Sequence, residues 1–352
     1  MSLFYLFIFT LLVTKISCRG LQTEKRARQL FLSRNVVTES VEFDGGVLVD
    51  ENGTIAGVYT RDSINKLLSA DDGSLEVIDG GDWALMAGGV DSHVHVNEPG
   101  RTTWEGYVTA TRAAAAGGFT TIVDMPLNSI PPTTTIENLK IKTSAAKEEA
   151  YVDVAFWGGV VPGNEVELQN LVNAGVVGFK GFLIDSGVSE FPNVDTNDLD
   201  KIFSTLNGTD TVLAFHAEYP ISKDNNGSHC EGCDSTGLSL FWTEAKARGY
   251  SLSAVSHFLS SGPARLVGLG NQKGSLKPGL DADLVFFDPN ASFIVTPDII
   301  VYKNKLSPYM YRVLNGKVMQ TYLRGQLIYT DGEVFENPKG QLLVNEDGLR
   351  KL

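Results

Sequence analysis

The sequence predicts an α/β fold in which a core of alternating strands and helices is flanked by β-rich segments at both chain ends. Three observations predict it. From about residue 104 to residue 216, apolar β-branched runs alternate with stretches of helical composition, which is typical of βα units and a parallel sheet. Segments 35–85 and 278–329 instead hold short apolar runs separated by turn residues. Glycine is abundant, with 36 among 352 residues, which suits many tight turns.

The composition is that of a globular protein and excludes several classes. Hydrophobic residues make up 43% and charged residues 20% of the chain, which rules out a disordered, collagen-like or disulfide-scaffold protein. The formal net charge of -13 argues against a nucleic-acid partner, because such a surface needs clustered basic side chains.

The N-terminus resembles a secretory signal peptide. Residues 1–13 are almost entirely apolar, a run too short for the roughly 20 residues of a membrane-spanning helix. Ser17 and Cys18 are small enough to precede a cleavage site. We therefore expect residues 1–18 to direct the chain to the secretory pathway, the ER lumen or the extracellular space, with no membrane span. A cytoplasmic location is the alternative.

The β-rich ends are expected to form short antiparallel strands. Asn52-Gly53 lies between two apolar runs and is a strong hairpin signal. Neither end alone buries a sheet face well, so we expect the two ends to pair into one small β-sandwich. The runs that suggest strands are 41–43, 46–49, 54–59, 283–287, 318–323 and 326–329.

The core is expected to repeat a strand followed by a helix. After Glu218 this alternation stops, and only helical stretches follow before the C-terminal strands. The expected strands are 119–124, 151–161, 176–183 and 211–216, and the expected helices are 104–116, 165–174, 197–206, 243–249 and 253–259.

The strongest chemical signal is the pair His93 and His95 at the end of an apolar run. Two residues at i and i+2 on a strand point to the same face, so both rings can bind one metal ion. Imidazole suits zinc. Alone this pattern is weak, because surface or packing histidines are its ordinary explanation.

Other polar residues fall at the ends of the expected core strands. Asn128 follows the strand 119–124, and His216 ends the strand 211–216. In a (β/α) barrel the active-site groups lie at the C-terminal ends of the strands. The side chains predicted to converge on one mouth are those of His93, His95, Lys180 and His216.

Lys180 lies in the apolar segment Gly178-Phe-Lys-Gly-Phe182. Burial lowers the pKa of a lysine and favours its neutral amine. A neutral amine reacts with carbon dioxide to give a carbamate, an anion able to bridge two metal ions. A lysine that reaches the surface is the alternative.

Several segments closely resemble the allantoinases, which are cyclic amidohydrolases related to dihydroorotases and hydantoinases. The resemblance begins with Asp91-Ser-His-Val-His-Val-Asn-Glu-Pro-Gly-Arg-Thr-Thr-Trp-Glu-Gly106. It continues through segments 115–121 and 124–133. Gly178-Phe-Lys-Gly-Phe182 resembles the carboxylated-lysine segment of that family, and Phe215-His-Ala-Glu218 its next metal-ligand strand. In all, the resemblance extends from about Asn35 to about Val334.

The resemblance implies metal-dependent hydrolysis of the cyclic amide of allantoin to allantoate. It implies two divalent metal ions, zinc by preference, bridged by carboxylated Lys180. His93 and His95 would hold one ion, and His216 would help to hold the other. The candidate substrate contacts are Asn97, Arg101 and Asn128.

Two groups of the family pattern are missing. We find no counterpart of its metal-binding histidine on barrel strand six or of its catalytic aspartate at the end of strand eight. Between Glu218 and Leu240 the chain has roughly twenty mostly polar residues where three strands belong. The region 88–269 holds roughly 180 residues, whereas such barrels need at least about 200. An exon-skipped product or an incomplete gene model explains this.

The resemblance and the missing segment together predict an incomplete TIM-like (β/α) barrel of the amidohydrolase type with a small β-sandwich. We expect this form to be impaired or inactive, with unpaired strand edges that a second copy can cover. The alternatives are a hydantoinase-like or dihydroorotase-like enzyme and a non-catalytic interaction protein of the same fold. The expected domains are a signal peptide at 1–18, a sandwich from 19–87 and 270–352, and a truncated barrel at 88–269.

Overall fold

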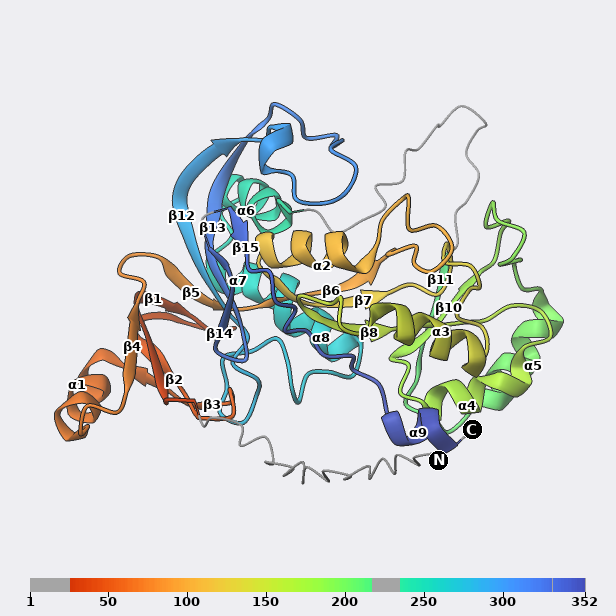
Figure 1. Cartoon of the computed structure of the whole chain (residues 1–352), viewed down its shortest axis with the longest axis horizontal. Coiled ribbons are helices and arrows are strands. Elements are labelled where there is room, and N and C mark those ends of the chain that lie inside the picture. The colour runs from red at the N-terminus through yellow and green to blue at the C-terminus, as the bar shows by residue number, and fades with distance from the viewer. Residues whose placement is uncertain (1–25, 217–234, 331, 352) are drawn as a thin grey trace, which may run out of the picture.

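The computed structural model places an arc of parallel strands beside a sheet that both chain ends build (Figure 1). It describes residues 26–216, 235–330 and 332–351. The expected signal peptide at 1–18 lies outside these ranges and stays a prediction. Within the described residues, every helix is too short or too polar to cross a membrane.

The two chain ends form one nine-stranded sheet in the order β15-β14-β13-β12-β5-β1-β2-β3, with β4 beside β1. The expected pairing of the ends is present, because β5 pairs antiparallel with β12 from Leu284 opposite Ala87 to Phe287 opposite Ala84. The strands are β1 (Gln29–Val37), β2 (Glu42–Val49), β3 (Ile55–Thr60), β4 (Glu76–Asp79), β5 (Ala84–Ala87), β12 (Leu284–Ile294), β13 (Val313–Leu323), β14 (Gln326–Thr330) and β15 (Glu333–Val334).

The sheet bends so that its N-terminal strands pack against its C-terminal strands. The ring of Phe31 on β1 lies edge-on to that of Tyr322 on β13, with 4.8 Å between the centroids. Phe286 on β12 lies 6.2 Å from Phe31. This packing buries one apolar face between the two chain ends, as expected for a sandwich. The hairpin expected at Asn52-Gly53 is also present, since β2 and β3 pair antiparallel around it.

The arc consists of two parallel three-stranded sheets, β6-β7-β8 and β9-β10-β11. The single strand expected at 151–161 is divided at Trp157, where the chain stops pairing with β7 and starts pairing with β10. Trp157 fixes this bend because its indole N–H donates to the Ser92 carbonyl at 2.9 Å. The strands are β6 (Gly89–Val94), β7 (Phe119–Asp124), β8 (Asp153–Phe156), β9 (Gly158–Gly159), β10 (Gly178–Phe182) and β11 (Val212–His216).

Helices follow most strands of the arc. The sequence did not predict four helices of the structure, namely α1, α3, α8 and α9. The helix α3 begins at an N-cap, because the Thr135 hydroxyl accepts from the Asn138 N–H. The helix α1 fully buries only Ile64, and Leu67 packs beside it on the same face. The helix bounds are α1 (Arg61–Ala70), α2 (Tyr107–Ala116), α3 (Ile136–Ala146), α4 (Leu168–Asn173), α5 (Thr196–Leu206), α6 (Gly237–Ala247), α7 (Leu252–Ser256), α8 (Gly262–Leu266) and α9 (Glu346–Lys351), with the helical turns η1 (Glu165–Glu167), η2 (His257–Ser261) and η3 (Pro297–Ile299).

The arc does not close into a barrel within the described residues. There, β6 pairs only with β7, and β11 pairs only with β10. Every residue of β11 is half-buried, whereas every residue of β10 is buried. The turn η2 and the helix α8 lie against β6 instead of a further strand. This agrees with the incomplete barrel expected from the sequence.

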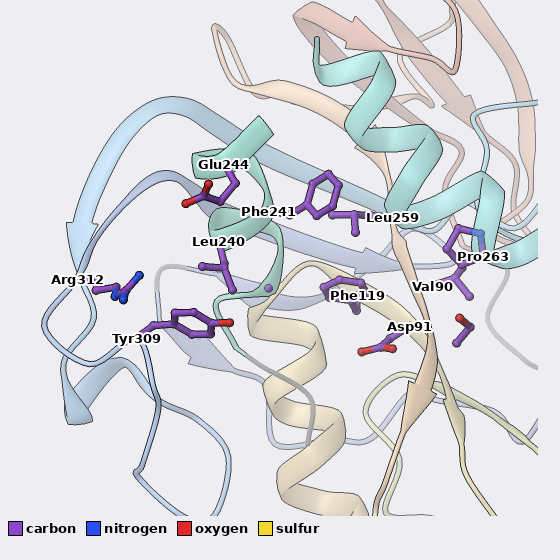
Figure 2. A pocket seen from close by; sticks show the side chains of 12 residues that line it. Val90, Asp91, Phe119, Leu240, Phe241, Glu244, Leu259, Pro263, Tyr309 and Arg312 are labelled. Carbon is purple, nitrogen blue, oxygen red and sulfur yellow. The ribbon is translucent and has the colours of Figure 1, made fainter. Parts of the chain in front are cut away.

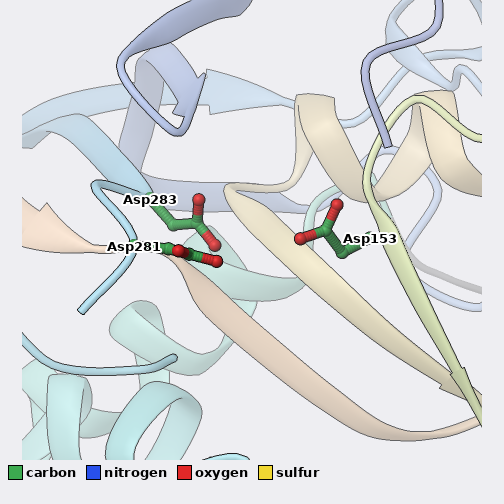
Figure 3. Close-up of side chains that lie close together, drawn as sticks. All are labelled: Asp153, Asp281 and Asp283. Atoms are coloured by element: carbon green, nitrogen blue, oxygen red, sulfur yellow. The ribbon is translucent and has the colours of Figure 1, made fainter. Parts of the chain in front are cut away.

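A buried ion cluster joins the arc to the sheet of the chain ends, and Figure 3 shows its three carboxylates, those of Asp153, Asp281 and Asp283. The Lys273 ammonium is 2.7 Å from Asp281 and 2.8 Å from Asp283, and it also contacts Asp153 of β8. Arg324, which follows β13, is 2.5 Å from Asp153. Burial alone would lower the pKa of Lys273, but the three carboxylates outweigh it and raise that pKa.

The C-terminal segment crosses the same region. Leu342 forms a parallel bridge to Val154 of β8. The Gln341 N–H donates to the Asp153 carboxylate at 2.7 Å, and the Leu343 N–H donates to the Val154 carbonyl at 2.8 Å. The segment therefore satisfies backbone groups at β8 that would otherwise lack partners.

A second ionic contact holds the loop after β1. The Glu39 carboxylate accepts from Ser275 at 2.6 Å, Lys277 at 2.8 Å and Arg265 at 3.1 Å. Burial alone would raise the pKa of Glu39, but these three donors lower it to about 2.

Replacing the central cation of the buried cluster should destabilise the protein strongly. Lys273→Met leaves buried carboxylates without their cation, which typically costs about 3–5 kcal/mol. Urea unfolding of the purified chain measures this loss. Lys201→Met is the control, because its exposed side chain makes only a 3.6 Å pair with Glu165 and should change stability by less than about 1 kcal/mol. Equal losses in the two variants would contradict the role assigned to Lys273.

Glu39 should make stability depend on acid pH. Its pKa in the folded chain is about 2, below the ordinary value of 4.5, so its contribution is present above pH 4.5 and disappears as the pH falls toward about 2. Unfolding of the parent and of Glu39→Gln is measured across this range. The difference between them should shrink as the pH falls. A difference that stays constant would show that Glu39 contributes no such linkage.

Candidate active site

The two histidines singled out in the sequence lie at the C-terminal end of β6, with His93 inside the strand and His95 directly after it. The rings of His93 and His95 have centroids 5.4 Å apart, which fits side chains on one face of a strand. Partial desolvation, together with the positive charges of Lys180 and His216, lowers the pKa of His93. Lys180 and His216 therefore lie near enough to His93 to influence its ionisation.

The ring of His95 is more deeply buried than that of His93. Burial, followed by the charges of His93, Lys142 and Lys180, lowers its pKa to about 3. At neutral pH the ring is therefore neutral, the form in which imidazole binds a metal ion. The side-chain amide nitrogen of Asn128 lies 3.3 Å from the His95 Nδ1.

Lys180 is buried in the middle of β10. Its Nζ lies 5.5 Å from the centroid of the Phe182 ring, and within the described residues it has no ion-pair partner. Burial lowers its pKa, which favours the neutral amine. His216 ends the neighbouring strand β11, directly opposite Phe182, and the two rings stack with centroids 4.8 Å apart.

The three candidate substrate contacts differ in what they already bind. Arg101 donates to the Asn128 carbonyl at 3.0 Å and to Glu190 at 2.6 Å, and its guanidinium stacks on Trp104. Asn97 is buried, and its side-chain oxygen accepts no hydrogen bond from the residues that the structure describes. An unused buried acceptor is costly and indicates a place for a donor of a ligand. Asn97 is therefore a better candidate for a substrate contact than Arg101.

A cavity of about 640 Å³ follows the unpaired edge of β6 (Figure 2). Three successive residues of β6, Val90, Asp91 and Ser92, line it on one side, and α6 lines it on the other through Leu240 and Phe241. Residues from both faces of a strand meet only at its edge, so the cavity occupies the space that a further strand fills in a closed barrel.

Asp91 was not singled out in the sequence as a titratable group. Burial raises its pKa to about 6, although the His93 N–H donates to its carboxylate. It precedes His93 by two residues and lines the cavity in Figure 2. The signal in the sequence was a third polar residue at the i, i+2, i+4 spacing.

The acidic group Asp153, Asp281 and Asp283 has the geometry of a metal site, because its oxygens lie within 4.8 Å of one another. However, the Lys273 ammonium contacts all three carboxylates. A cation is thus already present in this group, and we assign no metal ion to it.

The strand-six histidine and the strand-eight aspartate of the family pattern have no replacement among the described residues at this end of the arc. His257 lies in the helical turn η2, as the sequence indicated, and its Nδ1 lies 3.1 Å from Arg265. Asp224 and His229, two titratable residues of the polar segment before Leu240 that could take these roles, lie outside the described residues. The structure thus brings His93, His95, Lys180 and His216 to one end of the arc, and their roles as metal ligands stay predictions.

The chain is similar to known proteins both in sequence and in fold. The model of the amidohydrolase family matches residues 84–225 and 235–328. Allantoinase from Streptomyces avermitilis is 33% identical over 396 residues, covering 76% of this chain and 88% of the relative. Allantoinase from Arabidopsis thaliana is 42% identical over 464 residues, covering 90% of each chain. The structure of L-hydantoinase from Arthrobacter aurescens has a TM-score of 0.80 at 21% identity, covering 91% of this chain and 100% of that one.

The lengths of the two allantoinase alignments indicate that residues are missing from this chain. Both are longer than the 352 residues of the chain, so each relative carries residues that this chain lacks. The family match is interrupted between residues 225 and 235. That break coincides with the short polar segment where the sequence predicted a deletion.

Proposed function

Because the chain belongs to the amidohydrolase family, we propose that it carries, in an incomplete and impaired form, the type of site with which allantoinases hydrolyse the cyclic amide of allantoin. The observation that carries this proposal is the position of Lys180, buried and without an ion-pair partner in the described structure, beside His93 and His216. A buried amine of this kind is costly as a structural element and suited to carbamate formation.

The residues present fit two divalent metal ions, for which zinc is the expected identity. His93 and His95 would hold one ion and His216 would contribute to the other, and the neutral ring of His95 suits this role. In forming the carbamate, the Lys180 nitrogen bonds to the carbon of carbon dioxide and loses a proton to solvent. Such ions supply a Lewis acid and lower the pKa of water at the site.

The remaining residues position the substrate. The unused side-chain oxygen of Asn97 is placed to accept an N–H of a cyclic amide. Arg101 binds the Asn128 carbonyl and so supports the loop that carries Asn128 next to His95. No carboxylate of the described residues occupies the place of the family's strand-eight aspartate, so the chain lacks a positioned group to protonate the leaving nitrogen.

The chain should show no detectable hydrolysis of allantoin. Loss of a positioned acid–base group typically costs about 10²–10⁴ in rate, and a displacement of about 1 Å in an open arc can cost roughly 100-fold more. Allantoate formation by the purified chain is measured with zinc or manganese and bicarbonate, beside the intact Arabidopsis thaliana relative. Hydantoin and dihydroorotate serve as alternative substrates. Turnover within about tenfold of the relative would show that other residues supply the missing roles.

Lys180 should be the site of carbamate formation. With ¹³C-labelled bicarbonate and zinc, the parent chain should give a carbamate carbon signal by NMR, and Lys180→Met should lose it together with part of the bound zinc. Lys201→Met keeps Lys180 and should retain both, because Lys201 lies exposed on α5. A carbamate signal that persists in Lys180→Met would refute the assignment.

A further inference from the structure

Behind the histidines lies a buried polar network that the proposed reaction does not use. Asp124, the last residue of β7, is fully buried. One of its carboxylate oxygens accepts from the Val96 N–H at 3.0 Å, and the other accepts from the Tyr107 hydroxyl at 2.7 Å. The same oxygen is 3.0 Å from the ammonium of Lys142, which is also buried.

The network holds the chain on both sides of His95. Val96 directly follows His95, so the bond from its N–H to Asp124 fixes the peptide that carries the ring out of β6. Asn128 contacts the ring itself, with its side-chain nitrogen 3.3 Å from His95 Nδ1. The two contacts therefore determine where the ring lies.

Lys142 holds the segment that carries Asn128. Its ammonium donates to the Met125 carbonyl at 2.7 Å and to the Ser129 hydroxyl at 3.2 Å, one on each side of Asn128. Asn128 itself has a φ of 70°, a left-handed conformation that asparagine tolerates better than most residues. Lys142 thus fixes a loop whose backbone would relax without external contacts.

The energetics favour a positioning role over a purely stabilising one. Burying a carboxylate and an ammonium costs desolvation free energy that their attraction only about offsets, so apolar residues of similar volume would stabilise the core at least as well. Fixed polar contacts do, however, specify one arrangement of the backbone groups they bind. Here those groups are the Val96 N–H and the Met125 carbonyl, which flank the two residues that meet at His95.

We infer that Tyr107, Asp124 and Lys142 form a positioning network that sets the orientation of His95 and Asn128 for metal binding. This inference rests on the proposed function, because it assigns the network to the same metal site. It also makes a claim about the metal-free chain, since the orientation of the His95 ring should depend on the network before any metal ion binds.

The test uses the full chain and the substitution Tyr107→Phe, which removes one hydroxyl and keeps the ring packed. Tyr151→Phe is the matched control, because Tyr151 is also buried in the arc and its hydroxyl donates to the Glu336 carbonyl at 2.8 Å, away from the histidines. Cobalt(II) titration followed by visible absorption reports metal affinity and ligand geometry. Thermal unfolding reports stability.

Tyr107→Phe should weaken cobalt binding by about 10-fold to 100-fold, the range seen when outer contacts of a metal ligand are removed. It should also change the absorption band, while its melting temperature falls no further than that of Tyr151→Phe. Lys142→Met should weaken binding similarly. Parental affinity and an unchanged band in both variants would overturn the inference.

A metal-independent measurement separates this inference from the proposed function. In chains labelled with ¹³C-histidine and free of metal, the His95 ring signals, assigned with His95→Asn, should shift in Tyr107→Phe and stay unchanged in Tyr151→Phe. If the parent binds no cobalt but these signals shift, the proposed metal site fails while the positioning role stands. If cobalt binds and neither signals nor affinity change, the positioning role fails alone.

Discussion

The ammonium group of Lys273 is the contact on which the relation between the two parts of the molecule depends. It meets carboxylates from β8 of the arc and from the segment that enters β12 of the chain-end sheet. The Asp283 carbonyl in that segment also accepts from the Gly88 N–H at 2.8 Å, and Gly88 is the single residue between β5 and β6. The cluster thus fixes the point from which β6 starts toward His93.

The open arc keeps its form because each of its inner strands is buried by its own neighbours. The strands β7 and β10 have partners on both sides, and β10 is fully buried. A parallel barrel loses the pairing of its edges when strands are removed, whereas the βα units that remain still bury their own apolar faces. The backbone groups left unpaired are therefore those of β6 and β11, the two strands whose C-terminal ends carry the histidines of the site.

Local patterns of the sequence predicted most of the strands and the two histidines on β6, because alternation and apolar runs are local properties. They did not predict α1, because segment 35–85 was interpreted as β-rich although Ile64, Leu67 and Leu68 have the i, i+3, i+4 spacing of a helix. They also did not predict α3, where only the N-cap Thr135 marks the start. The convergence of Lys180 with His93 was predicted from the rule that active-site groups lie at the C-terminal ends of barrel strands, whereas their shared role as metal ligands required the family resemblance. No local pattern relates Asp153 to Lys273, since their contact spans 120 residues of sequence.

The network around Asp124 was missed for a related reason. Asp124 ends an expected strand, and Lys142 lies between Lys140 and Lys147 in a stretch for which no element was predicted, so the sequence shows the burial of neither residue. Only the fold reveals that both are enclosed and that they meet. Local sequence patterns do not reveal titratable groups that only tertiary contacts bring together.

The crossing of the C-terminal segment over β8 governs when the chain can finish folding during its synthesis. The Asp153 carboxylate receives donors from Lys273, Arg324 and Gln341. While the ribosome is still translating the middle of the chain, this carboxylate has none of these donors, and β8 has no cover. The contacts that complete the arc at β8 therefore form only after the last of these residues has emerged, although the strands of the arc were made long before.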